Sequence, residues 1–383
     1  MVQRMATTNL GALRELAGFR AAKGCAISLY LDLDPQTTIN PGDVQTRVNS
    51  LLDVGGRNAG FESDRLSRDQ KHALREDVER VKRFFVEDFD RSGMRAFALF
   101  TSSLDNLWTT LPLPCPVADD VRLGRELYLS PLLTVVGRGE GALVAVVSRE
   151  RGDVYRLRGG RLQEVANETE AAPNQHDQGG WSQARFQRHV DEVVARHIRK
   201  VAETIDKRVR REPSTQLVLV AAEEIRSDVE SALAAESRSA IVGWASAEAH
   251  VAGQELLEVA EPLLERARAD RERNALDRWR EESARDGRAA SGWASTLEAA
   301  SDGRVELLLV QDRANREAYA CPQCGRGSVT DGSCPLDGTL MEKRADGLDL
   351  AVHRTLEHGG SVWLARHTED LGPVEGIGAL LRF

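Results

Sequence analysis

Short apolar runs separated by segments with helical spacing constrain the fold of this chain more than any other feature of its sequence. The longest runs, such as Ala142–Val147 and Leu217–Ala222, have the length of buried strands and contain no charged residue. A membrane-spanning helix needs roughly 18 apolar residues in a row, so neither run predicts one. Strands that alternate with amphipathic helices predict an α/β fold.

Length and composition set the number of domains and the class of partner. The chain has 383 residues, of which 41% are hydrophobic and 29% charged. These values predict two or three globular domains and exclude disorder for most of the chain. The net charge of −9 argues against a coat of positive charge for duplex DNA. The N-terminal residues lack the apolar block of a secretory signal, which predicts a cytoplasmic location.

The first predicted domain covers residues 1–132 and is an α/β unit. Strands are expected at Ala26–Leu33 and Arg95–Phe100, with an amphipathic helix between them. The apolar positions of that helix are Leu74, Val78, Val81 and Phe85. Asp32 and Asp34 end the first strand and could share a divalent cation, although an Asp before Pro35 more often serves the turn itself.

The second predicted domain covers residues 133–268 and is built on a mixed sheet. Its expected strands are 142–148, 153–157, 161–165, 217–222 and 240–244. Gly159 and Gly160 predict a two-residue hairpin turn, because paired glycines accept the positive φ that such turns need. A helix with apolar residues at helical spacing from Phe186 to Ile205 follows, with Ser182 as its N-cap and Pro213 beyond its end.

The third predicted domain covers residues 269–383 and follows a long helix expected over Glu255–Arg288. A helix is expected at Trp293–Ala300, a strand at Val305–Val310, and a final helix and strand within Asp349–Ala365. This is an α/β sandwich with a cysteine-rich insertion at 321–338.

That insertion predicts a metal site. Three of the five cysteines lie in Cys321–Cys334, and in a reducing compartment such spacing suggests a metal rather than disulfides. Cys321, Cys324, Cys334 and Asp337 form two short turns, each followed by glycine, which fits a tetrahedral Zn²⁺ ion. Four protein ligands leave no open position, so the zinc would be structural. The alternative is a pair of tight turns with reduced, unliganded thiols.

A second group of residues predicts contact with RNA. Gly179, Gly180 and Trp181 lead into a helix in which Arg185–Arg211 carries nine Lys or Arg residues against four acidic ones. A basic helix behind a glycine loop in an acidic protein suggests phosphate recognition. The alternative is an ordinary turn before a helix, with Trp181 packed on the sheet. The candidate RNA-binding residues are Trp181, Arg185, Arg188, Arg196, Arg199 and Lys200.

Several stretches, in this order, resemble the archaeal and eukaryotic class-1 peptide release factors and Pelota. The stretches are the Gly-Gly loop with its basic helix, Arg278–Glu282, Ser295–Ala299, Val305–Val310 and the Cys-x-x-Cys turn. The segment Gly-Gly-Trp-Ser-Gln-Ala-Arg-Phe-Gln-Arg, which begins at Gly179, is most similar to bacterial members of that superfamily. The resemblance covers residues 133–383 and implies a three-domain release-factor fold.

The resemblance implies a translation factor whose partners are the ribosome and tRNA, with a translational GTPase as a further partner. Family members use a Gly-Gly-Gln tip to position water on the peptidyl-tRNA ester. Here Trp181 stands at the glutamine position, and Gln183, two residues later, becomes the candidate catalytic residue beside Gly179 and Gly180. The first domain has no stretch that matches the stop-codon-reading motifs, which favours ribosome rescue over codon-directed termination. The alternatives are a non-catalytic hibernation factor in the ribosomal A site and a tRNA-cleaving nuclease that uses Arg185 and Arg188.

Overall fold

The computed structural model consists of two compact units. It describes residues 4–5, 10–34, 41–58, 66–91, 94–135, 141–158, 160–169, 182–212, 215–246, 253–285, 287–366 and 371–383. One unit contains residues 1–137 and 271–383, and the other contains residues 138–270. Both are α/β, as predicted, whereas the division into three domains stays a prediction. No helix among these residues is long and apolar enough to cross a membrane.

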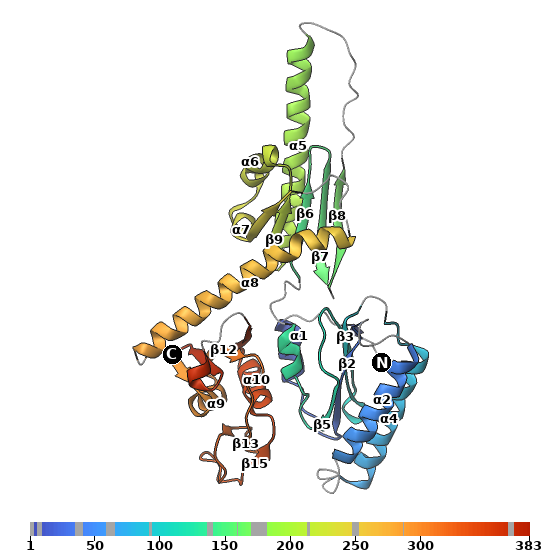
Figure 1. Ribbon diagram of the computed structural model, residues 1–383, viewed down its shortest axis with the longest axis vertical. Coiled ribbons are helices and arrows are strands. Elements are labelled where there is room, and N and C mark those ends of the chain that lie inside the picture. The colour runs from blue at the N-terminus through green and yellow to red at the C-terminus, as the bar shows by residue number, and fades with distance from the viewer. Residues whose placement is uncertain are drawn as a thin grey trace. The chain divides into compact units, whose positions relative to one another are not determined.

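A five-stranded sheet organises the N-terminal part of the first unit, in the order β1-β4-β3-β2-β5. Its strands are β1 (Arg4–Met5), β2 (Ala26–Asp32), β3 (Ala96–Ser102), β4 (Leu107–Leu113) and β5 (Asp120–Gly124). The helices are α1 (Leu10–Ala17), α2 (Pro41–Asn58) and α4 (Arg68–Glu87), with short 3₁₀ turns η1 (Ser103–Asp105) and η2 (Ser130–Thr134). The helices α2 and α4 cover one face, where Val48 and Phe84 pack with Leu99 (Figure 1).

A four-stranded sheet organises the C-terminal part of the same unit, in the order β11-β17-β12-β16. Its strands are β11 (Ala289–Ser291), β12 (Val305–Gln311), β16 (Ser361–Ala365) and β17 (Ile377–Leu381). The remaining elements are α9 (Trp293–Ser301), α10 (Gly347–Glu357), η3 (Gly372–Val374), and a small sheet of β13 (Ala318–Ala320), β14 (Gly327–Ser328) and β15 (Glu342–Arg344). Residues of α9 and α10 join one core cluster with this sheet, and Trp279 of α8 (Gly253–Ala284) joins another.

A shared core joins these two parts of the first unit. One apolar cluster includes Leu13 and Tyr30 from the N-terminal part and Leu308 from the C-terminal part. At this joint the buried His353 of α10 faces two backbone carbonyls, with Nε2 at 2.5 Å from Leu127 O and Nδ1 at 3.3 Å from Ala17 O. A carbonyl oxygen only accepts hydrogen bonds, so a ring nitrogen that bonds to either of them does so as the donor.

The second unit is built on a sheet in the order β10-β9-β6-β7-β8, parallel through β10, β9 and β6 and antiparallel from β6 to β8. Its strands are β6 (Leu143–Val147), β7 (Arg151–Arg158), β8 (Arg161–Thr169), β9 (Leu217–Val220) and β10 (Ile241–Ala245). The predicted hairpin is confirmed, because Arg158 pairs with Arg161 across a two-residue turn. The sheet is mixed, as the alternation of strands and helices predicted.

Helices on both faces bury this sheet. They are α5 (Ser182–Arg211), α6 (Glu223–Ala232), α7 (Ala235–Ser239) and the first part of α8. Ser182 is the first helical residue of α5 rather than its predicted N-cap, a difference within the usual uncertainty of helix boundaries. A glycine in β7 lets α5 approach closely, because a Cβ atom at Gly152 would lie 2.1 Å from Val201 Cγ2.

We expect Gly152→Ala to destabilise the second unit, because the added methyl group overlaps Val201 and forces α5 away from β7. Overpacking of this kind costs about 1–3 kcal/mol of unfolding free energy. Thermal and urea unfolding measure the loss. Gly42→Ala in α2, where an added Cβ meets nothing within 4 Å, is the control and should not lower stability. Equal unfolding midpoints for the two variants would show that the close approach does not constrain the packing.

Candidate functional site

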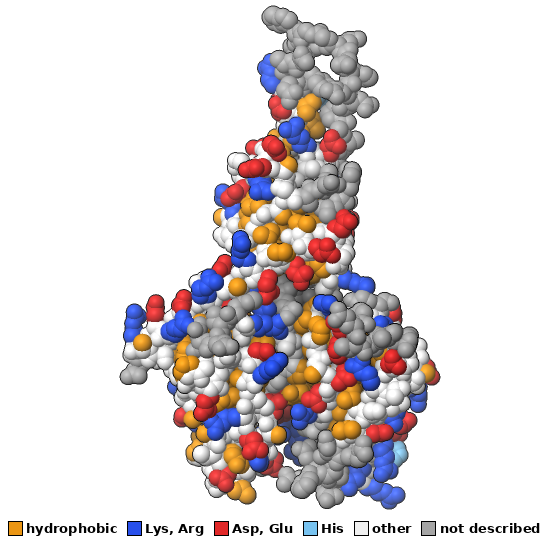
Figure 2. Space-filling model, in the orientation of Figure 1, with side chains coloured by type: hydrophobic (Ala, Val, Ile, Leu, Met, Phe, Trp, Pro, Cys, Tyr) orange, Lys and Arg blue, Asp and Glu red, His pale blue; other side chains and the backbone are white. Residues whose placement is uncertain are grey.

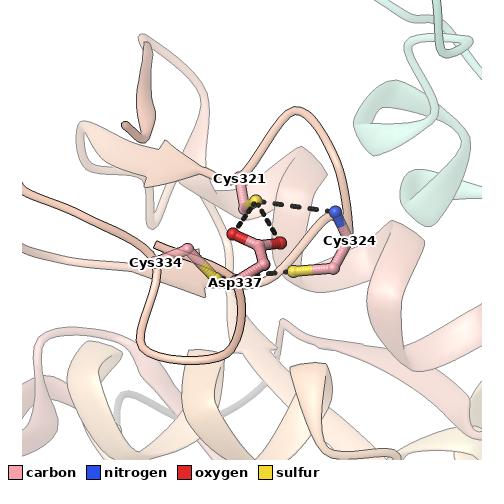
Figure 3. A group of neighbouring side chains, drawn as sticks. All are labelled: Cys321, Cys324, Cys334 and Asp337. Atoms are coloured by element: carbon pink, nitrogen blue, oxygen red, sulfur yellow. Dashed lines mark hydrogen bonds between the residues drawn. The ribbon is translucent and has the colours of Figure 1, made fainter. Parts of the chain in front are cut away.

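The four predicted metal ligands lie together in the small sheet region of the first unit. Their ligand atoms are all within 4.8 Å of one another. The Sγ atoms of Cys324 and Cys334 are 3.5 Å apart, and Cys321 Sγ lies 3.3 Å from an Asp337 carboxylate oxygen (Figure 3). Ligands about 2.3 Å from a tetrahedral Zn²⁺ lie roughly 3.7 Å from one another, so the donor atoms fit such an ion.

The two turns that present these ligands share one backbone pattern. In the first, Gly325 N–H donates to Cys321 O at 2.8 Å, and in the second, Gly338 N–H donates to Cys334 O at 2.9 Å. Both glycines have a positive φ, of 74° and 73°. Asp337 therefore occupies the place in the second turn that Cys324 occupies in the first. The four side chains form one group because the two turns are equivalent.

Hydrogen bonds and burial leave the ligands in different protonation states before any metal binds. The Thr339 N–H donates to the Asp337 carboxylate and holds its pKa at about 2. Desolvation raises the pKa of the Cys324 thiol to about 12. Desolvation also acts on Cys334, but backbone N–H groups that donate to its sulfur outweigh it, and the pKa of this thiol is lowered. A metal ion would displace the thiol protons and replace these internal hydrogen bonds.

Packing fixes the first turn in place. A Cβ atom at Gly325 would lie 2.3 Å from Arg354 Nη1, so the guanidinium packs directly on the glycine. Arg354 is itself held by Glu126 at 3.1 Å and Glu357 at 2.9 Å. Because Glu126 belongs to the N-terminal part of the unit, this chain of contacts ties the first cysteine turn to both parts.

The basic helix α5 has a buried apolar face and an exposed charged face. Among its described side chains, which begin at Arg188, the first buried ones are His197 and Ile198, whereas Arg188 and His189 are exposed. The exposed basic residues between Arg188 and Arg211 are Arg188, Arg196, Arg199, Lys200, Lys207, Arg210 and Arg211. Helical spacing places those from Arg196 onward away from the face of Ile198 and Ile205. Acidic and basic side chains alternate on the visible surface here, so the positive charge is not an unbroken strip (Figure 2).

Some of the predicted RNA-binding side chains are already engaged. Lys200 pairs with Glu168 of β8 at 2.8 Å, and Arg199 Nε donates to Ala195 O in its own helix. Arg188 also has a partner, whereas Arg196 is exposed with no ion pair among the described residues. The sequence did not reveal Glu168 as a partner, because it precedes Lys200 by a long segment and only the sheet brings them together.

Other predicted site residues lie outside what the structure describes. Gly179, Gly180 and Trp181 fall outside the described residues. Gln183 and Arg185 belong to the first turn of α5, but their side chains also lie outside the description. The backbone amides of the first helical turn have no partner within the helix and favour negative charge. The roles of these residues therefore stay predictions.

The possible cation pair at the end of β2 has ordinary turn contacts. The Asp34 N–H donates to Asp32 Oδ1 at 3.0 Å, and Arg95 lies 3.9 Å from Asp34 Oδ2. Within the described ranges, the cysteine group is the one cluster with metal-ligand geometry. These contacts favour the turn interpretation.

Comparisons with known proteins support the predicted relationship. Residues 128–268 match the family model of bacterial archaeo-eukaryotic release factor family 10. Peptide chain release factor subunit 1 of Archaeoglobus fulgidus is 26% identical over 282 residues, which is 67% of this chain and 69% of the relative. The Methanobrevibacter smithii protein of that name is 21% identical over 355 residues, 86% of this chain and 82% of the relative. A structure of ribosome-bound archaeal Pelota and ABCE1 aligns with a TM-score of 0.41 and 14% identity, covering 75% of this chain and 77% of that one. The family-model match and the sequence similarity to the archaeal release factors confirm the resemblance to the archaeo-eukaryotic release factor superfamily.

We expect the purified protein to hold about one metal ion per chain, because the four donor atoms already stand at ligand spacing. Cys321→Ser removes one thiolate and should lose most of the metal on passage over a chelating resin, as measured by elemental analysis. Cys115→Ser, which changes a buried cysteine outside the cluster, is the matched control and should keep its metal. Equal metal content in both variants would contradict the assignment of the ligands.

Proposed function

We propose that this protein is a translation factor that acts on the ribosome and on tRNA, through the exposed face of α5 and the Gly179–Trp181 segment that precedes it. The observation that carries the proposal is that α5 begins well before it reaches the core of its unit. The helix starts at Ser182 (Figure 1), and the first buried side chain among its described residues, which begin at Arg188, is His197. At 1.5 Å per residue, the described stretch from Arg188 to Arg196 is about 12 Å of helix with no buried side chain.

The proposed chemistry at that end is the hydrolysis of peptidyl-tRNA. Such a reaction needs a water molecule held in line with the ester and donors for the developing oxyanion, and it needs no charged base. Gln183 is the proposed positioning group, since it is the second residue of α5, and Gly179 and Gly180 would let the backbone approach the substrate closely. The curated relatives are peptide chain release factors, which supports this reaction class.

One observation favours a second function, the non-catalytic occupation of the ribosomal A site. Gln183 lies within the first helical turn instead of in the preceding loop, and a helical position limits its reach toward a substrate. Trp181 would then serve as a stacking platform for an RNA base, an interaction of about 1–3 kcal/mol. Both functions use the same end of the same helix.

The proposed metal is Zn²⁺, with a structural role. Three thiolates and one carboxylate suit this ion in their softness and number, and together they fill a tetrahedral shell. Zinc would replace the thiol hydrogen bonds as the link between the two turns. A cytoplasmic location, where thiols stay reduced, fits this role, and a translational GTPase is the further partner that the family resemblance suggests.

We expect the wild-type protein to release peptide from ribosome-bound peptidyl-tRNA, and Gln183→Ala to reduce the rate about 100-fold, as is usual when an oxyanion donor or water-positioning group is removed. Gln187→Ala, one turn further along α5, is the matched control and should stay within about twofold of the wild type. Released peptide and intact tRNA are measured separately. An inactive wild type would contradict the catalytic proposal, and cut tRNA would indicate the nuclease instead.

Ribosome binding should depend on the exposed face of α5. We expect Arg196→Gln combined with Arg199→Gln to weaken co-sedimentation with ribosomes. The slope of log affinity against log salt should fall by about 0.7–0.9 for each phosphate group that the variant no longer neutralises. Arg161→Gln, an exposed arginine on β8 of the same unit, is the control and should bind like the wild type. Identical salt slopes for all three proteins would show that α5 does not bind phosphate.

A further inference from the structure

A pocket in the first unit combines residues from its N-terminal sheet and from the region of the cysteine turns. The cavity has a volume of about 260 Å³. Arg20 and Arg125 line it from the N-terminal part, and Pro322 and Arg344 line it from the C-terminal part. Pro322 lies between the ligands Cys321 and Cys324, so one wall of the pocket is a metal-ligating turn. This pocket lies in the unit that does not contain α5.

The charge of the pocket wall is strongly positive. Three arginines line it, Arg20, Arg125 and Arg344, against a single acidic residue, Glu342. Within the described ranges, no ion pair joins any of the three arginines to an acidic side chain. Arg20 is held in place by a different interaction, since its Nη2 donates to Pro322 O at 3.1 Å.

Other arginines of the same unit behave differently. Those with carboxylate partners include Arg47 with Asp119, Arg316 with Glu375, Arg326 with Asp302, and Arg354 with Glu126. Three arginines that line one cavity without such partners repel one another, and this repulsion lowers the stability of the unit. An anionic ligand would relieve it, because guanidinium groups form paired, charge-assisted hydrogen bonds with phosphate oxygens.

The remaining walls are neutral and suit the rest of a small ligand. Cys25 and Gly124 also line the pocket, and neither carries a charge. Gln70, in the first turn of α4, lines another side, and its amide is fixed by donation to Lys23 O at 2.9 Å. The N-terminal end of α4 adds partial positive charge on that side. The volume lies just below the usual range for small-molecule pockets, which is room for little more than one nucleotide.

We propose that this pocket binds the phosphate group of a nucleotide, with the guanidinium groups of Arg20, Arg125 and Arg344 as its ligands. The phosphate belongs to a free mononucleotide or to one residue of a single RNA strand. A duplex does not fit a concave site of this size. The bound phosphate draws the N-terminal sheet and the cysteine turns together, because its ligands come from both. The proposal stands on residues that the proposed function does not use.

Isothermal titration calorimetry of the full chain with adenosine 5′-monophosphate tests the proposal, with adenosine and inorganic phosphate as parallel titrants. We expect the monophosphate to bind, adenosine to bind at least about tenfold more weakly, and affinity to fall as salt is raised. Arg125→Gln and Arg344→Gln should each weaken binding about tenfold or more, since each removes a charge-assisted hydrogen bond. A titration with a uridine hexanucleotide separates the two sources: tighter binding of the hexamer than of the monophosphate identifies an RNA strand.

Arg83→Gln provides the matched control. Arg83 is also exposed and lies on α4, thirteen residues or about 20 Å beyond Gln70, and its replacement should leave binding unchanged. Thermal unfolding confirms that all three variants fold. Binding of neither the monophosphate nor the hexamer, or binding that Arg125→Gln and Arg344→Gln leave intact, would overturn the proposal. Ribosome co-sedimentation of the same variants reports separately on the proposed function, which depends on α5.

Discussion

The first unit depends on the buried joint at His353, where an imidazole faces carbonyl oxygens from two separate segments of the N-terminal part. Asp349 lies beside the imidazole: its carboxylate is 3.6 Å from Nε2 and accepts hydrogen bonds from the backbone N–H groups of Leu129 and Ser130. Burial raises the pKa of Asp349, and the backbone N–H groups of Leu129 and Ser130 that donate to its carboxylate act in the opposite direction. Such a network specifies one docking geometry, because every member loses its partner if α10 shifts.

That docking geometry positions both sites of the unit. The pocket takes arginines from each part, and the metal-ligating turn rests on Arg354, one residue after His353 on α10. The phosphate pocket and the cysteine cluster are therefore neighbours that rest on the same buried interactions. A metal ion would stiffen the turn that carries Pro322, and so one wall of the pocket. Packing would therefore couple metal binding at the cysteine cluster to anion binding in the pocket.

In the second unit, the long helix α5 packs on the sheet through its C-terminal part. The close approach at Gly152 and the buried residues from Ile198 onward fix the C-terminal part of α5 to its sheet. Between Arg188 and Arg196, none of the described side chains is buried. A helix anchored in this way can carry a short segment to a target outside its own domain. The charged side chains along the helix then set the strength of binding to that target. Ion pairs such as Lys200 with Glu168 reduce the positive charge that the helix can offer to a phosphate group.

The sequence by itself determined the local features, because each depends on residues a few positions apart. Helical spacing predicted α4 and α5, the paired glycines predicted the hairpin after β7, and two similar four-residue spacings predicted the cysteine cluster with Asp337. The strands β11 and β17 were missed, since Ala289–Ser291 and Ile377–Leu381 become strands only by pairing with distant segments. Charge was the least predictable property. In the sequence, Lys200 and Arg344 are both simply basic residues. In the structure, Lys200 pairs with the carboxylate of Glu168, whereas Arg344 lines a pocket. Only the tertiary structure decided this, because an ion pair or a cavity joins side chains whose separation along the chain carries no information about their distance in space.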